Sequence, residues 1–210
     1  PSAGSVGPMT DHARTTGSLD ARRVAFLGPV GTFTEQAMLR EADLAAAEMV
    51  PMATMADVLF AVNDGDVDLG VVPIENAIEG TVNATIDTLA FDVDLVIQRE
   101  LVEPVSLHLL VQPGAPLSGI KVIHSIPVAA AQCRAWLREH VPGAELRAAN
   151  STAEAAETCA TLADPTVAAI ANARAAQVYG LELGASDIES HPENRTRFVV
   201  VARSGIPVPT

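Results

Sequence analysis

The sequence has few aromatic and few basic residues. Aromatic side chains make up 3% of the 210 residues, so the hydrophobic core must be built from Ala, Val, Leu and Ile. Such a composition favours helices packed on a parallel sheet over a β-sandwich. The 13 Lys and Arg residues oppose 26 Asp and Glu residues, which gives a formal net charge of −13. Without a basic stripe to neutralise phosphates, nucleic acid is excluded as a partner, and an anionic ligand must depend on local arginines.

Long hydrophobic runs and cysteines are also scarce. No apolar run approaches the ~20 residues that cross a bilayer, so we expect no membrane partner. Residues 1–21 lack the apolar core of a signal peptide and are rich in Ser, Thr, Gly and Ala, which predicts a flexible leader. The two cysteines, Cys133 and Cys159, have no histidines at metal-ligand spacing. We therefore expect a cytoplasmic protein with reduced packing cysteines, no metal and no cofactor.

Short apolar strands alternate with helices twice along the chain. The predicted strands of the first half are 24–27, 49–52 and 69–73, and its helices are 35–47, 55–63 and 82–89. After a Pro- and Gly-rich break at 113–116, strands are predicted at 122–123, 146–148 and 167–171, and helices at 128–140, 153–162 and 173–179. These βα repeats predict an α/β protein of two lobes with parallel, helix-covered sheets and a cleft between the lobes.

The segment 95–111 contains two extended apolar stretches, which we interpret as one long strand through the waist between the lobes. The predicted domains are then a leader, a first lobe with hinge strands, a second lobe and a tail, at residues 1–21, 22–98 plus 189–203, 99–188 and 204–210.

Small polar residues follow several predicted strands. Gly28 to Thr32 reads as a glycine-containing turn before a helix, with Thr32 or Thr34 as the candidate cap, and such a corner can bind an anion. In the second lobe Ser125, Ser151 and Asn172 each follow a strand. One such residue is ordinary capping, but three at one sheet edge predict a lined cleft, because ligands of α/β sheets bind at the carboxyl ends of the strands.

The segment 73–82 follows the third strand and is rich in functional groups. It contains Glu75, Asn76, Glu79, Gly80 and Thr81. Glu75 could polarise a substrate or handle a proton if it is partly buried. For Glu79 and Thr81, a capping or loop role is as good an interpretation as contact with a substrate.

The segment 194–203 places Thr196 and Arg197 directly before an apolar strand at 199–202. One interpretation is an anion pocket in which Arg197 binds a carboxylate and Thr196 offers a hydroxyl group. The alternative is a polar strand edge with solvated charges. The histidines, among them His124, His140 and His191, have no carboxylate at a recognisable spacing, so they are interpreted as surface or capping residues.

Taken together, residues 22–203 resemble the catalytic domain of the prephenate dehydratase family. The resemblance is carried by Gly28–Phe33, Val72–Val82, Pro127 with Gln132–Cys133, Ala169–Ala171, Tyr179–Leu181, and Asn194 followed by Thr196–Phe198. It implies two α/β lobes like a type II periplasmic binding protein, with the substrate in the cleft. It also implies a hydro-lyase of phenylalanine biosynthesis that converts prephenate to phenylpyruvate, carbon dioxide and water.

The resemblance further implies roles for single residues. The threonine of the family's Thr-Arg-Phe motif, here Thr196, is regarded as essential to catalysis. We expect Thr196 to hydrogen-bond the departing hydroxyl group, with Glu75 as a source of the proton, and Arg197 to hold a carboxylate. The predicted substrate contacts are Thr32, Asn76, Gly80, Thr81, Ser125, Ser151, Asn172 and Phe198. A homo-oligomer, either dimer or tetramer, is expected.

The sequence departs from the family pattern at several positions. Ala77 stands where Ser is usual, Ile126 where His is frequent, and Arg195 where an aromatic or other residue is more usual. Bacterial members usually continue into an ACT domain that binds phenylalanine, whereas residues 204–210 read as a linker-like tail, so feedback inhibition is not assumed. The alternatives are a prephenate decarboxylase that does not aromatise the ring, an arogenate dehydratase, and a solute-binding module without chemistry.

Overall fold

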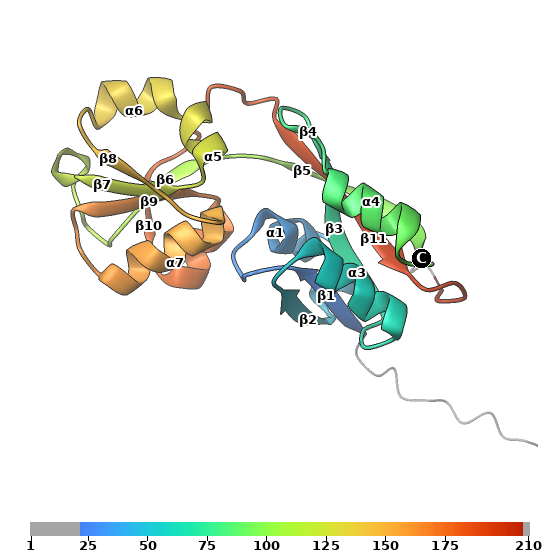
Figure 1. Ribbon diagram of the computed structural model, residues 1–210. Coiled ribbons are helices and arrows are strands. Elements are labelled where there is room, and N and C mark those ends of the chain that lie inside the picture. The colour runs from blue at the N-terminus through green and yellow to red at the C-terminus, as the bar shows by residue number, and fades with distance from the viewer. Residues whose placement is uncertain (1–21, 208–210) are drawn as a thin grey trace, which may run out of the picture.

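The computed structural model describes residues 22–207, so the predicted leader at 1–21 and the last three residues lie outside the described part. Two lobes, each a sheet with helices on its faces, are joined by two crossing segments (Figure 1). The two-lobed α/β architecture predicted from the βα rhythm is confirmed.

The first lobe is built around a sheet with the strand order β2-β1-β3-β11-β5, to which β4 is added beside β3. Strands β1, β2 and β3 are parallel, whereas β11 runs antiparallel to both β3 and β5. The predicted parallel arrangement is therefore confirmed for β1, β2 and β3 and is wrong where β11 joins the sheet. Its elements are β1 (Arg23–Leu27), α1 (Phe33–Leu39), α2 (Ala42–Ala45), β2 (Glu48–Met52), α3 (Met55–Asp64), β3 (Leu69–Asn76), β4 (Gly80–Thr81), α4 (Asn83–Phe91), β5 (Val96–Pro104) and β11 (Arg195–Ala202).

The second lobe has the strand order β10-β6-β9-β7-β8. Strand β7 is parallel to β8 and β9, while β6 is antiparallel to β9 and to β10. The predicted helix over 128–140 is divided at Cys133 into two helices. Its elements are β6 (His108–Val111), the 3-10 helix η1 (Leu117–Gly119), β7 (Val122–Ser125), α5 (Pro127–Gln132), α6 (Arg134–His140), β8 (Glu145–Ala148), α7 (Thr152–Leu162), β9 (Val167–Ala171), α8 (Ala173–Tyr179) and β10 (Glu182–Ala185).

The chain passes between the lobes at residues 105–107 and again at 186–194. The sequence placed the first crossing after residue 98, which lies within β5. The observed crossing comes later, because β5 belongs along its whole length to the first sheet. The single waist strand predicted over 95–111 is instead two strands in different sheets. Strand β11 begins four residues earlier than predicted, so Thr196 and Arg197 are part of the strand.

Small aliphatic side chains form the core on both faces of each sheet, as the composition predicts. Phe198 is 2% exposed and packs with Phe26, Met38 and Leu69 in the core beside α1. The prediction that Phe198 contacts substrate is therefore corrected: it is a core residue. Cys133 and Cys159 are free and buried, and burial raises the pKa of their thiols to about 12 and about 11, which fits a packing role.

Candidate active site

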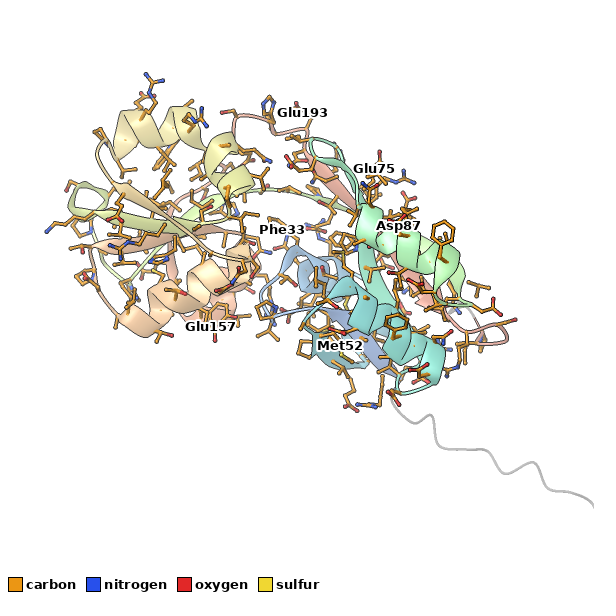
Figure 2. The ribbon with its side chains drawn as sticks, in the orientation of Figure 1. Phe33, Met52, Glu75, Asp87, Glu157 and Glu193 are labelled. Atoms are coloured by element: carbon orange, nitrogen blue, oxygen red, sulfur yellow. The ribbon has the colours of Figure 1, made fainter. Side chains whose placement is uncertain are left out.

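A cavity of about 160 Å³ lies between the two lobes. Both lobes and both crossing segments contribute to its wall, and Phe33 from the start of α1 stands at the junction (Figure 2). It therefore occupies the interlobe position predicted for the substrate. The lining residues are Phe33, Asn76, Glu79, Val105, Leu107, Ile126, Val128, Ala129, Gln132, Thr152, Asn194 and Thr196.

Asn76 makes the Thr196 oxygen an acceptor and so determines in which direction the hydroxyl group can donate. Asn76 Oδ1 accepts hydrogen bonds from the backbone N–H groups of Ile78 and Glu79 at 2.9 and 3.0 Å. Its amide nitrogen must therefore point the other way, where Nδ2 donates to Thr196 Oγ1 at 2.9 Å. Because a hydroxyl group has one hydrogen and two lone pairs, Thr196 keeps its own hydrogen for a further acceptor. No such acceptor is found for it among residues 22–207, and Thr196 lines the cavity.

Asn194 is the second polar residue that β11 and its approach bring to the cavity. It is 1% exposed, and its Nδ2 donates to Oε1 of Gln132 from α5 at 3.2 Å. Its backbone is held at both ends: the N–H donates to the carbonyl of His191, and the carbonyl accepts from the N–H of Val105. Asn194 Oδ1 has no hydrogen-bond partner in the described chain.

Arg197 and Glu75 are not brought to this cavity. They are opposite each other in the β3–β11 pair, one position along from Asn76 and Thr196, and successive side chains of a strand point to opposite faces. The Arg197 guanidinium donates to both Glu75 and Glu100 on that other face, and Figure 2 places Glu75 beside the start of β11. The hydrogen bond between Arg197 and Glu100 raises the pKa of the guanidinium and lowers the pKa of the Glu100 carboxyl. The structure thus places Arg197 and Glu75 away from this cavity, and their predicted roles in binding a carboxylate and supplying a proton stay predictions.

Three other predicted contacts are helix caps. Thr32 caps α1 and Ser151 caps α7, each accepting from the backbone N–H three residues on, and Asn172 caps α8 in the same way. The hydroxyl group of Thr32 also donates to the carbonyl of Leu27 at 3.1 Å, so its hydrogen is already engaged. Asn172 is completely buried, and its Nδ2 has no partner among the described residues. None of these three side chains lines the cavity with Thr196.

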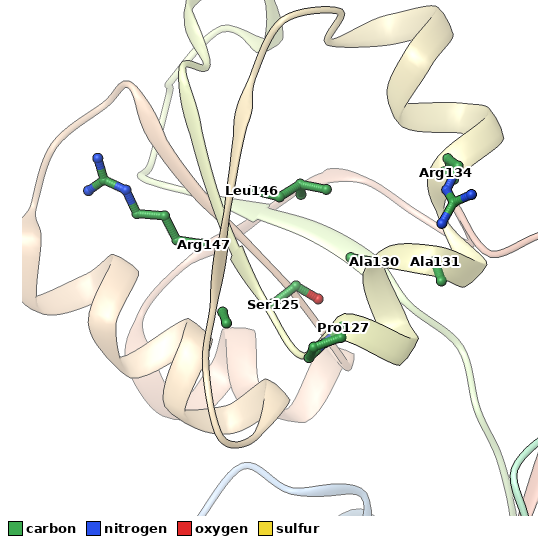
Figure 3. Close-up of a pocket in the computed structure, with 8 residues that line it drawn as sticks. Ser125, Pro127, Ala130, Ala131, Arg134, Leu146 and Arg147 are labelled. Carbon is green, nitrogen blue, oxygen red and sulfur yellow. The ribbon is translucent and has the colours of Figure 1, made fainter.

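Ser125 is also placed elsewhere. It lies at the end of β7 in a hollow of the second lobe whose wall is formed by α5, α6 and β8, together with Arg134 and Arg147 (Figure 3). Gly80 and Thr81 form β4 and pair with Asn76 and Glu75, respectively, across the hairpin. Of the residues predicted to bind or transform the substrate, the structure brings Asn76 and Thr196 together in the cavity.

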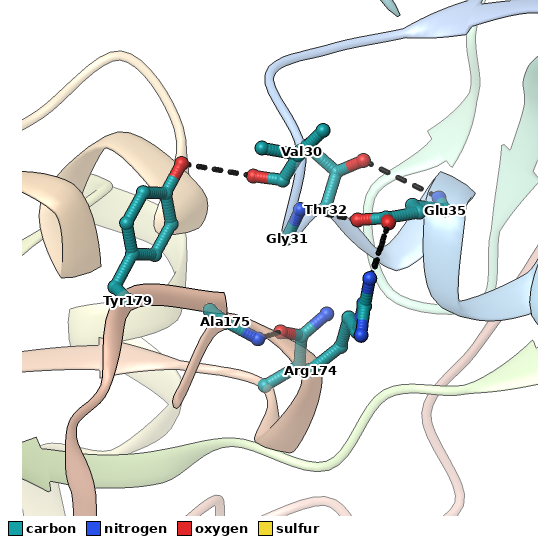
Figure 4. Close-up of polar contacts among 8 residues, drawn as sticks. Val30, Gly31, Thr32, Glu35, Arg174, Ala175 and Tyr179 are labelled. Atoms are coloured by element: carbon teal, nitrogen blue, oxygen red, sulfur yellow. Dashed lines mark hydrogen bonds and ion pairs between the residues drawn. The ribbon is translucent and has the colours of Figure 1, made fainter. Parts of the chain in front are cut away.

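The two lobes are joined beside the cavity by side-chain bonds (Figure 4). Arg174 from α8 donates to Oε1 of Glu35 in α1 at 2.8 Å, while the Glu35 carboxylate also accepts from the N–H of Gly31. The hydroxyl group of Tyr179 donates to the carbonyl of Val30 at 3.0 Å. These contacts hold the loop 28–32 of the first lobe against α8 of the second.

Few charged side chains lie on the wall of the cavity. Among its lining residues Glu79 is the ionisable one, and no Lys, Arg or His side chain is present. Neutral groups must therefore bind any carboxylates of a ligand, and the amides at the start of α7, where Thr152 lines the wall, are of the right kind. Within residues 22–207 no three His, Cys, Asp or Glu side chains are grouped so that they could hold a metal ion.

A comparison with known proteins gives the family. The family model described as prephenate dehydratase matches residues 24–205. The chain belongs to the prephenate dehydratase family. It is 43% identical over 197 residues to the prephenate dehydratase of Mycolicibacterium vanbaalenii, a match that covers 88% of this chain and 62% of that relative. The resemblance read from the sequence motifs is thus confirmed.

Solved structures agree with this membership. A prephenate dehydratase from Arthrobacter aurescens in complex with L-Phe superposes with a TM-score of 0.81 at 39% identity, over 90% of this chain and 63% of that one. A protein described as GqqA, a novel type of quorum quenching acylase, superposes with a TM-score of 0.76 at 30% identity, over 90% of this chain and 67% of that one. The chain spans about three fifths of the length of the curated prephenate dehydratases that it matches.

Sequence reasoning missed part of this site. Asn194 could have been found, because it precedes Thr196 by two positions and a strand carries such residues on one face. Gln132 and Thr152 come from α5 and α7 of the other lobe, and their place at the cavity depends on how the lobes meet. The pairing of Glu35 with Arg174 joins residues 139 positions apart and leaves no local pattern in the sequence.

Proposed function

We propose that this chain is the catalytic domain of a prephenate dehydratase, which converts prephenate to phenylpyruvate, carbon dioxide and water. One observation carries the proposal: Thr196, whose Oγ1 accepts from Asn76, keeps a free hydrogen at a cavity between the two lobes. The family membership of the chain supports the choice of substrate.

The reaction needs a group that assists the departing oxygen. The ring C–O bond breaks with its electrons on oxygen, and the bond to the ring carboxylate supplies an electron pair to the ring as carbon dioxide leaves. Hydroxide is a poor leaving group, so the oxygen must gain a proton and depart as water. Thr196 donates a hydrogen bond to this oxygen, and Glu79, the ionisable side chain on the cavity wall, supplies the proton. Proton transfer from a positioned side chain typically contributes a factor of about 10²–10⁴ in rate.

Neutral groups of the cavity bind the two carboxylates of prephenate. The start of α7 offers free backbone amides beside Thr152, since the Ser151 cap occupies the amide of Glu154. The apolar part of the wall, from Phe33, Leu107 and Ile126, suits the ring. Arg197 and Glu75 then have a different role, which is to fix the register of β3 and β11 behind the site.

Incubation of the chain with prephenate tests the proposal, with phenylpyruvate read by its absorbance in base. Formation of phenylpyruvate supports the dehydratase. Consumption of prephenate without an aromatic product would show a non-aromatising decarboxylase, and binding without turnover would show a solute-binding module. A parallel reaction with arogenate, which carries an amine on the side chain, separates the arogenate dehydratase.

Two further expectations accompany this function. Each described helix is too short or too polar to cross a membrane. The proposal includes a cytoplasmic location and assembly into a dimer or tetramer. Strand β5 ends the first sheet and exposes Ile97 and Val102 at 54% and 49%, an edge that suits contact with a second chain. Light scattering of the purified chain measures the assembly.

A further inference from the structure

Asn194 is a buried residue in the wall of the interlobe cavity, and its side chain has an acceptor without a partner. The residue is 1% exposed and lines the cavity, and its Oδ1 has no hydrogen-bond partner among residues 22–207. Every other polar group of the residue is engaged, by Gln132, His191 and Val105. A buried acceptor left unpaired costs free energy unless a ligand supplies a donor. A ligand bound in the cavity that Asn194 lines could supply this donor.

Asn194 and Thr196 together match a group that both donates and accepts. Asn194 Oδ1 can accept a hydrogen bond, whereas the Thr196 hydroxyl group can donate one because Asn76 donates to its oxygen and leaves its hydrogen free. The two residues are two positions apart at the start of β11 and line the same cavity. A carboxylate or a ketone accepts only, so neither satisfies Asn194. A neutral hydroxyl group satisfies both.

We propose that Asn194 binds the ring hydroxyl group of the substrate, opposite Thr196, and stabilises it as it leaves; this inference rests on the proposed dehydratase function. In prephenate the ring hydroxyl group is the sole hydrogen-bond donor once both carboxyl groups are ionised. Its hydrogen is donated to Asn194 Oδ1, while its oxygen accepts from Thr196.

The contact with Asn194 strengthens as the reaction proceeds. The C–O bond breaks with its electrons on oxygen, the oxygen takes one proton from Glu79, and water departs while the ring carboxylate leaves as carbon dioxide. An O–H group becomes a better donor as its oxygen gains a proton, so its bond to Asn194 Oδ1 is stronger in the transition state than in the ground state. Interactions of this kind raise kcat.

The test compares two variants of the full chain with the wild type. Asn194→Leu removes the acceptor at similar volume. Asn194→Asp keeps an acceptor oxygen in the same place, and the Gln132 amide can rotate to donate to it. We expect kcat for prephenate to fall about 10²–10³-fold in Asn194→Leu. In Asn194→Asp we expect kcat within about tenfold of wild type and a raised KM, because the added charge opposes a dianion.

Product inhibition supplies the second readout. Phenylpyruvate has no ring hydroxyl group, so its inhibition constant should stay within about threefold of wild type in Asn194→Leu. Thermal melting followed by circular dichroism checks folding, and Asn194→Ala carries the same expectations if the leucine variant does not fold.

The outcomes separate the inference from the proposed function. A wild-type chain that forms no phenylpyruvate contradicts the function itself. With an active wild type, the inference is overturned if removal of the acceptor leaves kcat within threefold. It is also overturned if phenylpyruvate inhibition weakens as much as kcat falls and Asn194→Asp restores nothing, since the residue would then be structural.

Discussion

Asn76 Nδ2 donates to Thr196 Oγ1 across the β3–β11 pair at 2.9 Å, and this bond determines which way the threonine hydroxyl group faces. The Asn76 side chain cannot turn around, because its Oδ1 accepts two backbone N–H groups of the following loop. Thr196 is thereby made a donor toward the cavity. The chemistry proposed for the site depends on this donor direction of the Thr196 hydroxyl group more than on any charged residue.

Replacement of Asn76 by Asp should reverse the direction of the hydrogen bond between residues 76 and 196. The carboxylate still accepts from the loop, but it has no N–H to offer, so the Thr196 hydroxyl hydrogen turns toward it and is lost to the substrate. We expect kcat to fall about 10²–10³-fold while the melting temperature changes by a few degrees at most. Steady-state kinetics with prephenate and a thermal melt measure both. Unchanged turnover in a folded Asn76→Asp variant would show that the bond does not orient a catalytic group.

Glu79→Gln tests the source of the proton. The glutamine variant keeps the shape of the side chain but cannot transfer a proton, so we expect kcat to fall about 10²–10⁴-fold. The measurement is steady-state turnover of prephenate by both proteins, with Glu79→Asp as the conservative variant that keeps a carboxyl group. A folded Glu79→Gln variant with the kcat of wild type would assign the proton to solvent.

Arg197→Gln should affect stability more than chemistry. The guanidinium pairs with Glu75 and Glu100 on the face of β11 away from the cavity. All three side chains are more than one third exposed, so the network is screened by salt, and we expect a small fall in melting temperature that shrinks as salt is added. The KM for prephenate should stay within about threefold. A KM raised a hundredfold would mean that this guanidinium reaches the substrate after all.

Glu103 offers a test of electrostatics in the first lobe. Its side chain is 1% exposed beneath Arg40, its Oε1 accepts from Gln36 at 2.6 Å, and burial raises the pKa of the carboxyl above its ordinary value of 4.5. A carboxyl group with a raised pKa in the folded state binds its proton more tightly there than when unfolded. Its ionisation therefore lowers the free energy of unfolding as the pH rises above 4.5.

Glu103→Gln should thus melt higher, relative to wild type, at pH 8 than at pH 4. A gain of 1 kcal/mol corresponds to about 2–4 °C for a chain of this size. Thermal melts of both proteins at the two pH values give the comparison. The account of Glu103 fails if the variant loses more stability at pH 8 than at pH 4.

The sequence predicted the elements of the fold better than their connections. Local signals were sufficient for the helix starts at Ser151 and Asn172, because a capping side chain bonds to the backbone of its own helix. For the first helix they left two candidate caps, Thr32 and Thr34, of which the structure has Thr32. The antiparallel insertion of β11 between β3 and β5 was not predictable, since it joins segments more than 90 residues apart.

The same distinction explains the site. Thr196 and Asn76 were predicted from motifs, and the structure brings them together. Arg197 was predicted as a ligand-binding cation because its charge is visible in the sequence, whereas the face of the strand on which it lies depends on the register of β11. Glu79 was left between two interpretations, and only the closure of the lobes makes it part of a cavity wall.

The hydroxyl group of Thr196 is tested most directly by turnover of prephenate in Thr196→Ser and Thr196→Val. Serine keeps a hydroxyl group that Asn76 can orient, whereas valine has the same shape as threonine without it. We predict that Thr196→Ser forms phenylpyruvate with kcat within about tenfold of wild type and that Thr196→Val loses about 10²–10⁴-fold, with similar melting temperatures. A folded Thr196→Val variant with near wild-type kcat would contradict the account.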